Sequence, residues 1–355
     1  IKDHPYQWVD PGIVESVEAS DDRTVKITLT RDYAPFLDQV AGTLPILPEH
    51  IYKDVSDPAG FTDPEALTGT GPFKLVNYNK AQGTYLYEAN ENYYQGAPRV
   101  KQIKFVKVSL EMSAAALEKG DVDAATVPGE TVDGLKDNGY IVIKGTHDWL
   151  AKIMVNHMKA PFSDAKFRQA LYYAIDRQDL VKTGLRGYGL EGSPGLYASD
   201  NQWYNPDQEQ YPYDPAKSGE LLEELGYEKK DGSQYYTKAG EPEAIELLVT
   251  AINERQGELV SQQLDSAGIK VNLRSVDPKT LDSLVGEWKF DLAFSGHGGM
   301  GADPNMLNRY HLDMKSFNSA RYDDNTELNV ILESQVEEMD QDKREELVDS
   351  AQEII

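Results

Sequence analysis

The hydrophobic residues of the first 150 positions recur mainly at every second residue. After the Asp21-Asp22 turn, for example, Val25, Ile27 and Leu29 alternate with polar residues. A two-residue period is typical of a β-strand with one buried face. The same period occurs in three further segments, at 73–78, 84–88 and 100–108. This part of the chain is therefore predicted to be rich in β-hairpins, with one short helix at 111–119 that ends at Gly120.

A different period begins after a short apolar strand at 152–156. Ser163 or Asp164 is suited to cap the first turn of a helix, and Gly184 and Gly187 end the pattern. Between these points the apolar residues recur at three- and four-residue steps: Phe167, Ala170, Leu171, Ala174, Ile175 and Val181. The spacing predicts one long helix with a single apolar face.

Strand and helix periods alternate in the last third of the chain. Strands are predicted at 245–250, 269–276 and 290–295, and helices between them at 254–267 and 278–286. Such a βαβαβ order indicates neighbouring parallel strands in a layered α/β domain. Further helices are predicted at 215–225, 325–337 and 343–355.

Composition excludes several classes of function. With 60 acidic and 35 basic residues, the net charge of −25 repels nucleic acid, and no cluster of Lys or Arg offsets it. The charge indicates a solvated surface, or else solubility in a salty exterior or attraction of cationic ligands. The absence of cysteine excludes disulfides, thiolate catalysis and cysteine-based zinc sites. A length of 355 residues indicates two or more domains.

Two segments could be taken for catalytic or phosphate-binding motifs. Asp121 and Asp123 fall on one face of an extended segment, but the turn beside a helix end explains both acids without catalysis. Gly69 and Gly71 precede a strand rather than a helix, and no Lys-Ser/Thr pair follows them, so a phosphate loop is not indicated.

Two loops are better candidates for ligand binding. The loop at 189–213 carries Trp203 and Tyr204, which either line a ligand groove or seat the loop on the core. The second loop follows the strand that ends near Ser295 and reads Gly-His-Gly-Gly-Met-Gly-Ala-Asp-Pro at 296–304. Ligands of open α/β sheets collect beyond the carboxyl ends of strands, and glycines let backbone approach a ligand closely. The alternative for this loop is a tight structural connection.

The segment around the long predicted helix resembles the signature of a known family, the family 5 extracellular solute-binding proteins. These are the receptors of the peptide/nickel class of ABC importers. The matching residues occur in the family's order: Asn156, Pro161, Phe162, Asp164, Arg168, Gln169, Ala170, Ala174, Ile175, Asp176 and Arg177. The segments at 45–50, 69–73, 116–125 and 213–227 also resemble family motifs.

The resemblance implies an α/β, bilobal fold of the type II periplasmic-binding-protein kind. Residues 1–150 would form part of a first lobe, residues 151–340 a second α/β lobe, and residues 341–355 a helix returning toward the first lobe. Relative to the family, the sequence is expected to lack the leader, an N-terminal part and the final strands, so that the first lobe is incomplete and ligand affinity is poor.

The resemblance also implies the function: an extracytoplasmic protein, periplasmic or a cell-surface lipoprotein, that captures a small peptide-like ligand by hinge closure and delivers it to a membrane permease. Such a receptor is expected to be monomeric, to hold no cofactor, to catalyse no reaction and to bind no nucleic acid.

The glycine-rich loop departs from the family pattern Trp-x-x-Asp-x-x-[Asp/Glu]-Pro of peptide receptors. Asp303 matches the acid before proline, but Met300 stands where the ammonium-binding Asp is expected, and His297 where Trp is expected. Either the counter-charge comes from elsewhere or the ligand is not an ordinary free peptide. The candidate ligand-binding residues are His297, Gly298, Gly299, Met300, Asp303, Trp203 and Tyr204.

Three alternatives remain open at this point. His297 and Met300 could contact a metal, so a receptor for nickel or a metal chelate is the first, although the six histidines show no metal-binding spacing. A secreted hydrolase is the second, but the sequence has no G-x-S-x-G motif and no cysteine nucleophile. A purely structural extracellular module is the third.

Overall fold

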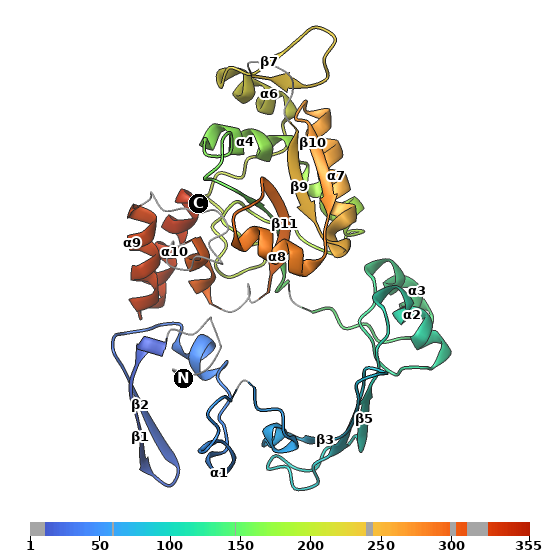
Figure 1. Ribbon diagram of the computed structural model, residues 1–355, viewed down its shortest axis with the longest axis vertical. Coiled ribbons are helices and arrows are strands. Elements are labelled where there is room, and N and C mark those ends of the chain that lie inside the picture. The colour runs from blue at the N-terminus through green and yellow to red at the C-terminus, as the bar shows by residue number, and fades with distance from the viewer. Residues whose placement is uncertain (1–10, 59, 146, 239–243, 299–302, 311–325) are drawn as a thin grey trace. The chain divides into compact units, whose positions relative to one another are not determined.

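The computed structural model describes residues 11–58, 60–145, 147–238, 244–298, 303–310 and 326–355, which fall into two compact units (Figure 1). The first unit comprises Ile1–Thr30 and Gln39–Ile143, and the second comprises Arg31–Asp38 and Lys144–Ile355. The main division lies close to the boundary predicted near residue 150. The assignment of residues 1–150, 151–340 and 341–355 to lobes stays a prediction.

The first unit contains two small antiparallel sheets. Strands β1 (Val14–Asp21) and β2 (Thr24–Leu29) form a hairpin. Strands β3 (Phe73–Asn79), β4 (Thr84–Ala89) and β5 (Gln102–Phe105) form a sheet in the order β3-β4-β5. The four predicted strands are confirmed, although β5 is shorter than its alternating pattern.

The helices of the first unit are short. They are η1 (Pro11–Ile13), α1 (Glu49–Tyr52), η3 (Pro64–Leu67), α2 (Leu110–Lys119), η4 (Gly129–Thr131) and α3 (Val132–Asp137), and the π-helical turn η2 (Phe36–Ala41) belongs to both units in sequence. Helix α2 ends at Gly120, whose φ of 73° is the left-handed conformation that glycine adopts without strain. The helix predicted at 111–119 is therefore confirmed.

A four-stranded sheet in the order β10-β9-β11-β6 forms the centre of the second unit. Strands β9 (Ile245–Val249), β10 (Val271–Ser275) and β11 (Leu292–His297) run parallel, and β6 (Leu150–Val155) pairs antiparallel with β11. Helix α7 (Glu254–Ser266) follows β9, and α8 (Pro278–Gly286) follows β10. The predicted βαβαβ unit is confirmed.

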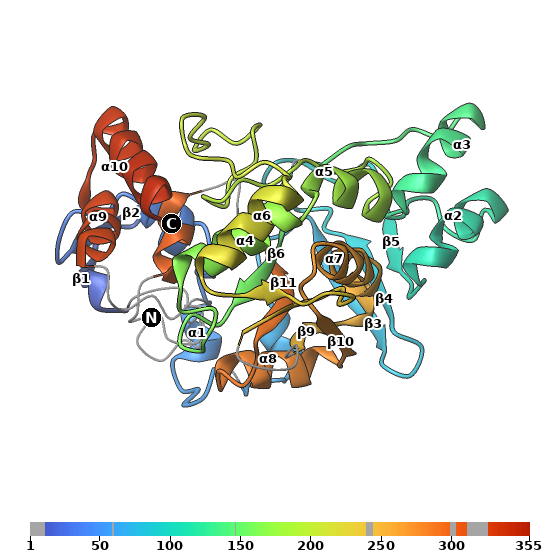
Figure 2. The ribbon, with the colours of Figure 1, turned by 90° about the horizontal axis from the view of Figure 1, so that it is seen from above.

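Helices cover both faces of this sheet (Figure 2). Leu247 and Val249 pack with Val260 and Leu264 of α7 on one face. Between them in sequence, Leu248 points to the other face and packs with Leu281 of α8. Because successive strand residues point to opposite faces, a nearly continuous apolar strand such as β9 is what a doubly covered sheet requires.

The long helix predicted from residue 163 is in fact three elements, of which the last two are continuous. Helix α4 (Ala165–Ala174) begins at Asp164, whose carboxylate accepts from the backbone N–H of Lys166, and it ends at Ile175, which is extended. Helix α5 (Arg177–Asp179) then continues into the π-helical turn η5 (Leu180–Gly184). The single-helix prediction is wrong because the Asp176 carboxylate accepts from the backbone N–H of Asp179 and so starts a new helix.

Two helices of the second unit lie apart from its sheet and form a cluster of their own. Helices α9 (Thr326–Glu337) and α10 (Gln341–Ile354) pack on the loop that follows η5, and they bury Leu328, Leu332, Val348 and Ala351 in a separate cluster. The remaining elements are α6 (Pro215–Glu224), β7 (Glu228–Lys229), β8 (Tyr236–Thr237), η6 (Ala251–Asn253) and η7 (Pro304–Tyr310). Within the ranges described above, no helix combines the length and apolar character needed to cross a membrane.

Candidate ligand-binding site

The bend predicted to face a ligand begins at the carboxyl end of β11. The α-carbon of Gly296 lies so close to the start of the paired strand β6 that an added Cβ would be 2.4 Å from the carbonyl oxygen of Leu150 and 2.7 Å from Nε1 of Trp149. At Gly298 the nearest atom would be Cε3 of Trp149, at 3.5 Å. Glycine is therefore required at residue 296, and the Trp149 ring lies along the start of the bend.

Trp149 is a residue of this site that the sequence did not reveal. Trp149 is 68% exposed, although it directly precedes the apolar strand β6. An exposed tryptophan beside a glycine-rich bend offers an apolar face to a ligand. The only local signal would have been a large aromatic residue at a strand start.

The predicted residues of the bend are only partly described. His297 is the last residue of β11, and its backbone pairs with that of Leu150. Gly298 follows directly. Gly299, Met300 and the side chain of His297 lie outside the described residues. Their role as ligand contacts therefore stays a prediction.

Asp303, at the far end of the bend, is buried in a two-pronged ion pair with Arg344 of α10. Both distances between guanidinium nitrogens and carboxylate oxygens are 2.9 Å. The same guanidinium donates to the backbone carbonyl of Gln335 at 2.8 Å and lies over the ring of Trp203, 5.6 Å from its centroid. With these contacts, the Asp303 carboxylate fixes the end of the bend to α9 and α10.

Trp203 and Tyr204 lie on the core formed with α9 and α10. Trp203 is buried in the cluster that contains Leu307 and Leu328, and Tyr204 packs against that cluster from the side. These contacts correspond to the second of the two predicted roles, seating the long loop on the core. A ligand contact for either residue stays a prediction.

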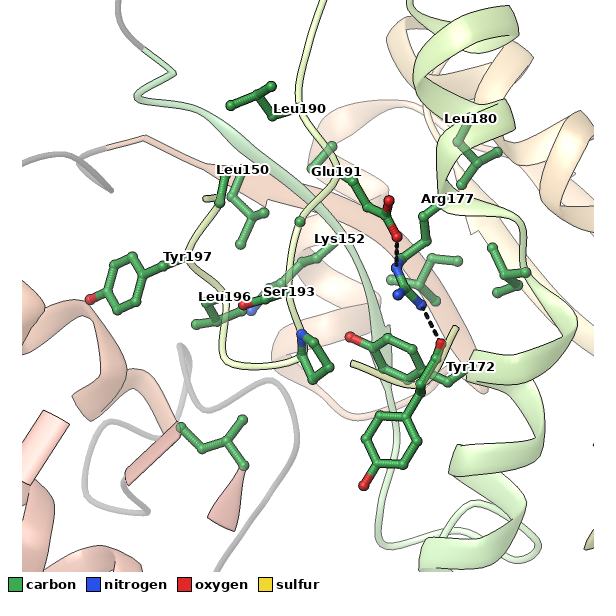
Figure 3. Close-up of a pocket in the computed structure, with 18 of the residues that line it drawn as sticks. Leu150, Lys152, Tyr172, Arg177, Leu180, Leu190, Glu191, Ser193, Leu196 and Tyr197 are labelled. Carbon is green, nitrogen blue, oxygen red and sulfur yellow. Dashed lines mark hydrogen bonds and ion pairs between the residues drawn. The ribbon is translucent and has the colours of Figure 1, made fainter. Parts of the chain in front are cut away.

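A cavity of about 1020 Å³ lies within the second unit (Figure 3), and Trp149 and Leu150, which lie against Gly296, are among its lining residues. Its walls come from β6, from the segment α4–η5, from the loop after η5 and from the end of α10. Gly298, Asp303, Trp203 and Tyr204 are not among its lining residues. Apolar side chains contribute most of the surface, among them Leu150, Ile153, Val155, Leu180, Val181, Leu185, Leu190 and Leu196.

A charged pair lies at one wall of this cavity. Nε of Arg177 is 3.1 Å from Oε1 of Glu191, and the other guanidinium nitrogens donate to the backbone carbonyls of Tyr211 and Gln210 (Figure 3). The Arg177 guanidinium also lies 5.0 Å from the centroid of the Tyr172 ring. Burial raises the pKa of Tyr172 to about 12.

Two histidines line the same cavity. Burial lowers the pKa of His157 to about 3, and the nearby Arg168 guanidinium adds to the effect by repelling a second positive charge. Nδ1 of His147 lies 2.5 Å from Oδ2 of Asp200. The described residues contain no group of three or more His, Cys, Asp or Glu side chains able to hold a metal ion.

Comparison with known proteins assigns the chain to a family. The family model described as "Bacterial extracellular solute-binding proteins, family 5 Middle" matches residues 2–318. The chain belongs to this family. Its members are extracellular or periplasmic receptors that bind a substrate and are not catalysts. The family predicted from the residues at 156–177 is thereby confirmed.

Curated relatives differ in the ligand that their names give. Heme-binding protein A of Haemophilus influenzae is 28% identical over 380 residues, which cover 99% of this chain and 66% of the relative. The glutathione-binding protein GsiB of Pectobacterium atrosepticum is 27% identical, with 75% and 49% covered. The dipeptide-binding protein of Escherichia coli is 30% identical, with 62% and 42% covered. The matched parts thus span 42% to 66% of the lengths of these relatives.

Solved structures share the fold. The oligopeptide-binding protein AppA from Bacillus subtilis, in complex with a nonapeptide, has a TM-score of 0.78 at 23% identity, with 97% of this chain and 70% of that chain covered. NikZ from Campylobacter jejuni, in complex with Ni(L-His), has a TM-score of 0.76 at 20% identity, with 96% and 69% covered. The predicted α/β fold of the type II periplasmic-binding-protein kind is confirmed.

Proposed function

We propose that this chain is part of the extracytoplasmic substrate-binding subunit of an ABC importer of the peptide/nickel class. It captures a small peptide-like ligand by closure of its lobes and delivers the ligand unchanged to membrane permease subunits. The observation that carries the proposal is the family match over residues 2–318. Such a receptor shifts between open and closed states and does not change its ligand chemically.

The ends of the bend support its role as the ligand contact. At one end, Gly296 brings the backbone of β11 against Leu150 and Trp149. At the other end, the buried pair of Asp303 and Arg344 attaches the chain to α10. A binding loop held between two fixed points has less conformational entropy to lose when a ligand orders it.

A receptor for nickel or a metal chelate is the second candidate. The chemistry of two residues favours it. In the family pattern of peptide receptors, Trp and Asp stand at the positions that His297 and Met300 occupy in this chain. Imidazole nitrogens and thioether sulfur both suit transition metals, whereas neither side chain neutralises a peptide ammonium group. The similarity of fold to NikZ is compatible with either ligand.

Isothermal titration calorimetry of the protein with a dipeptide, a tetrapeptide and Ni(L-His) distinguishes the candidates. Saturable heat with a peptide supports the first proposal, and saturable heat with Ni(L-His) supports the second. Mass spectrometry of the recovered peptide should show it intact, since a cleaved product would contradict a receptor.

Two glycine variants locate the binding site. Gly298→Val places a side chain against Trp149 at the start of the bend, so we expect at least a tenfold loss of affinity. The matched control is Gly69→Val in the first unit, where an added Cβ meets nothing within 4 Å. Equal affinities of the two variants would contradict the assignment of the bend as the ligand contact.

A further inference from the structure

The segment directly before β6 lies against both glycines at the start of the bend. A Cβ added to Gly296 would be 2.7 Å from Nε1 of Trp149, and one added to Gly298 would be 3.5 Å from Cε3 of the same indole. The two glycines therefore face one ring. Because Trp149 is 68% exposed, most of that residue stays accessible to a ligand at the bend.

Asp148 places a carboxylate at the same point. A Cβ added to Gly298 would be 3.6 Å from Oδ2 of Asp148, almost as close as it would be to Trp149. Asp148 is exposed, and a carboxylate accepts through about four lone-pair sites, so a bond within the protein leaves sites for the N–H groups of a ligand. Gly298 thus borders on an acid and an indole together.

The chain on either side of Asp148 is held in place. His147 precedes it, and Nδ1 of that imidazole lies 2.5 Å from Oδ2 of Asp200 in the long loop. Trp149 follows it and lies against the two glycines of the bend. A segment fixed at two neighbouring residues loses little conformational entropy when it binds a ligand.

A carboxylate beside an exposed indole suits a positively charged amino group. The carboxylate accepts charge-assisted hydrogen bonds from the N–H groups, and the ring attracts a cation through its π face. An anion would be repelled, and a neutral apolar group would cover the carboxylate without giving it a partner. A metal ion needs further ligands, and the described residues contain no group of three or more His, Cys, Asp or Glu side chains able to hold one.

We propose that Asp148 recognises a positively charged amino group of the ligand, with Trp149 packed beside that group. The inference rests on the proposed receptor function and adds to it the charge that the ligand carries. The position of the acid differs from the family pattern, which places it within the bend at the position of Met300. In this chain the acid comes from the segment before β6 instead.

A thermodynamic cycle tests whether the two charges pair. Titration calorimetry measures the affinity of the parent protein and of Asp148→Asn for tetra-alanine and for acetyl-tetra-alanine, which lacks the ammonium charge. In the parent, acetylation should weaken binding at least tenfold, and Asp148→Asn should weaken binding of tetra-alanine to a similar degree. In Asp148→Asn, acetylation should change the affinity less than threefold, because the charge has already lost its partner.

Asp282→Asn is the matched control. It removes the same charge from an exposed residue of α8, so the long-range field of the second unit changes equally. This variant should keep the tenfold preference for the free amino group, and Asp148→Glu, which retains the charge, should keep most of it. The Tm of Asp148→Asn should equal that of the parent, and a lower Tm with equal losses for both peptides would show a structural role and contradict the proposal.

Phenethylamine distinguishes the two sources of an amino group, because it carries the charge without a peptide. Binding of phenethylamine that is lost in Asp148→Asn identifies a site for small amines. Binding of tetra-alanine but not of phenethylamine identifies the amino terminus of a peptide. Both results support the proposal when the affinity depends on Asp148.

The failure of this proposal and of the receptor function can be told apart. Equal affinities of the parent for tetra-alanine and its acetylated form, or a preference that persists in Asp148→Asn, would overturn the role of Asp148 while the receptor function stands. Binding of Ni(L-His) alone would also overturn it and would support the second candidate function. A parent protein that binds none of these probes would contradict both proposals.

Discussion

The two units of this protein differ in how completely they bury their apolar residues. Among the described residues, the second unit contains three clusters of buried hydrophobic side chains, which cover both faces of its sheet and join α9 to α10. In the first unit, strand residues as large as Val25, Ile27 and Phe105 remain exposed. Because burial of apolar area is the main favourable contribution to folding, the stability of this protein is expected to reside largely in the second unit.

The helix N-termini of the two units also differ: those of the second unit are better capped. In the second unit, side-chain carboxylates of Asp164, Asp176, Asp214, Asp277 and Asp340 accept hydrogen bonds from backbone N–H groups at the start of a helix. In the first unit, α1, α2 and α3 begin without a side-chain hydrogen bond of this kind. Tertiary packing and local capping therefore support the same unit, which is the pattern expected of a body able to fold alone.

Cutting the chain after residue 143, which separates the two units except for Arg31–Asp38 of the second, is the strongest way to break this comparison. We expect a fragment of residues 144–355 to unfold in one cooperative thermal transition, because the three buried clusters found among its described residues lie within it. A fragment of residues 1–143 is expected to show no cooperative transition. Circular dichroism of both fragments during heating checks this, and a sharp transition for residues 1–143 would contradict it.

The buried ion pair of the second unit should contribute more to the free energy of unfolding than an exposed ion pair of the first unit. Arg344→Met leaves the Asp303 carboxylate buried without its partner, so we expect a loss of about 3–5 kcal/mol in the free energy of unfolding. Lys101→Met breaks the exposed pair of Lys101 and Glu91, for which a loss below about 1 kcal/mol is expected. Chemical denaturation measures both, and equal losses would refute the contrast.

Acid should destabilise the second unit through His157. Its pKa is lowered to about 3 in the folded protein by burial, against an ordinary value of 6.5. The contribution of the neutral imidazole to stability is therefore fully present above pH 6.5 and is lost as the pH falls toward 3. In His157→Gln, the decrease in unfolding free energy between pH 7 and pH 4 should be smaller than in the parent protein.

The matched control for this titration is His50→Gln in the first unit, where the side chain is exposed. It is expected to leave the pH dependence of the second unit unchanged. If the unfolding free energy of His157→Gln falls with pH as steeply as that of the parent protein, other groups cause the acid sensitivity.

The smallest expected effect concerns helix caps. Asp214→Ala removes a carboxylate that accepts from the backbone N–H groups of Ala216 and Lys217, and a loss of about 1 kcal/mol follows. Ser109→Ala at the start of α2 removes no such hydrogen bond, so its free energy of unfolding should change by only a few tenths of that amount. Urea denaturation of the two variants in parallel provides the measurement, and a larger effect at Ser109 would reverse the comparison.

Local signals in the sequence were sufficient for most of the fold. The Asp214-Pro215 start of α6 and the alternation at 84–88 that becomes β4 both depend on neighbouring residues only, and the structure places these elements where the pattern predicts them. The helix break at Ile175 was missed because Asp176 suits a polar helix face as well as a cap. In the structure, the Asp176 carboxylate accepts from the backbone N–H of Asp179, and the backbone N–H of Asp176 donates to Oε1 of Gln263, a tertiary contact that neighbouring residues in the sequence do not reveal.

The candidate sites could be predicted less well. The sequence placed the loop at the carboxyl end of a strand but began it at Gly296, two residues too early, because β11 extends through His297. The family pattern identified Asp303 as matching an acid of that loop. It could not show that Arg344, 41 residues later, pairs with that acid. The cavity beside β6 was not predicted at all, because its walls come from segments that lie far apart in the chain.

The position of Trp149 provides an optical probe of the bend. Indole emission depends on exposure to water, and Trp149 is exposed whereas Trp203 is buried beneath Arg344. A soluble quencher such as acrylamide should therefore reach the indole beside Gly296 and Gly298 far more readily than the one in the core. We expect a ligand that binds at the bend to change the quenching of Trp149, which intrinsic fluorescence can follow without an attached dye.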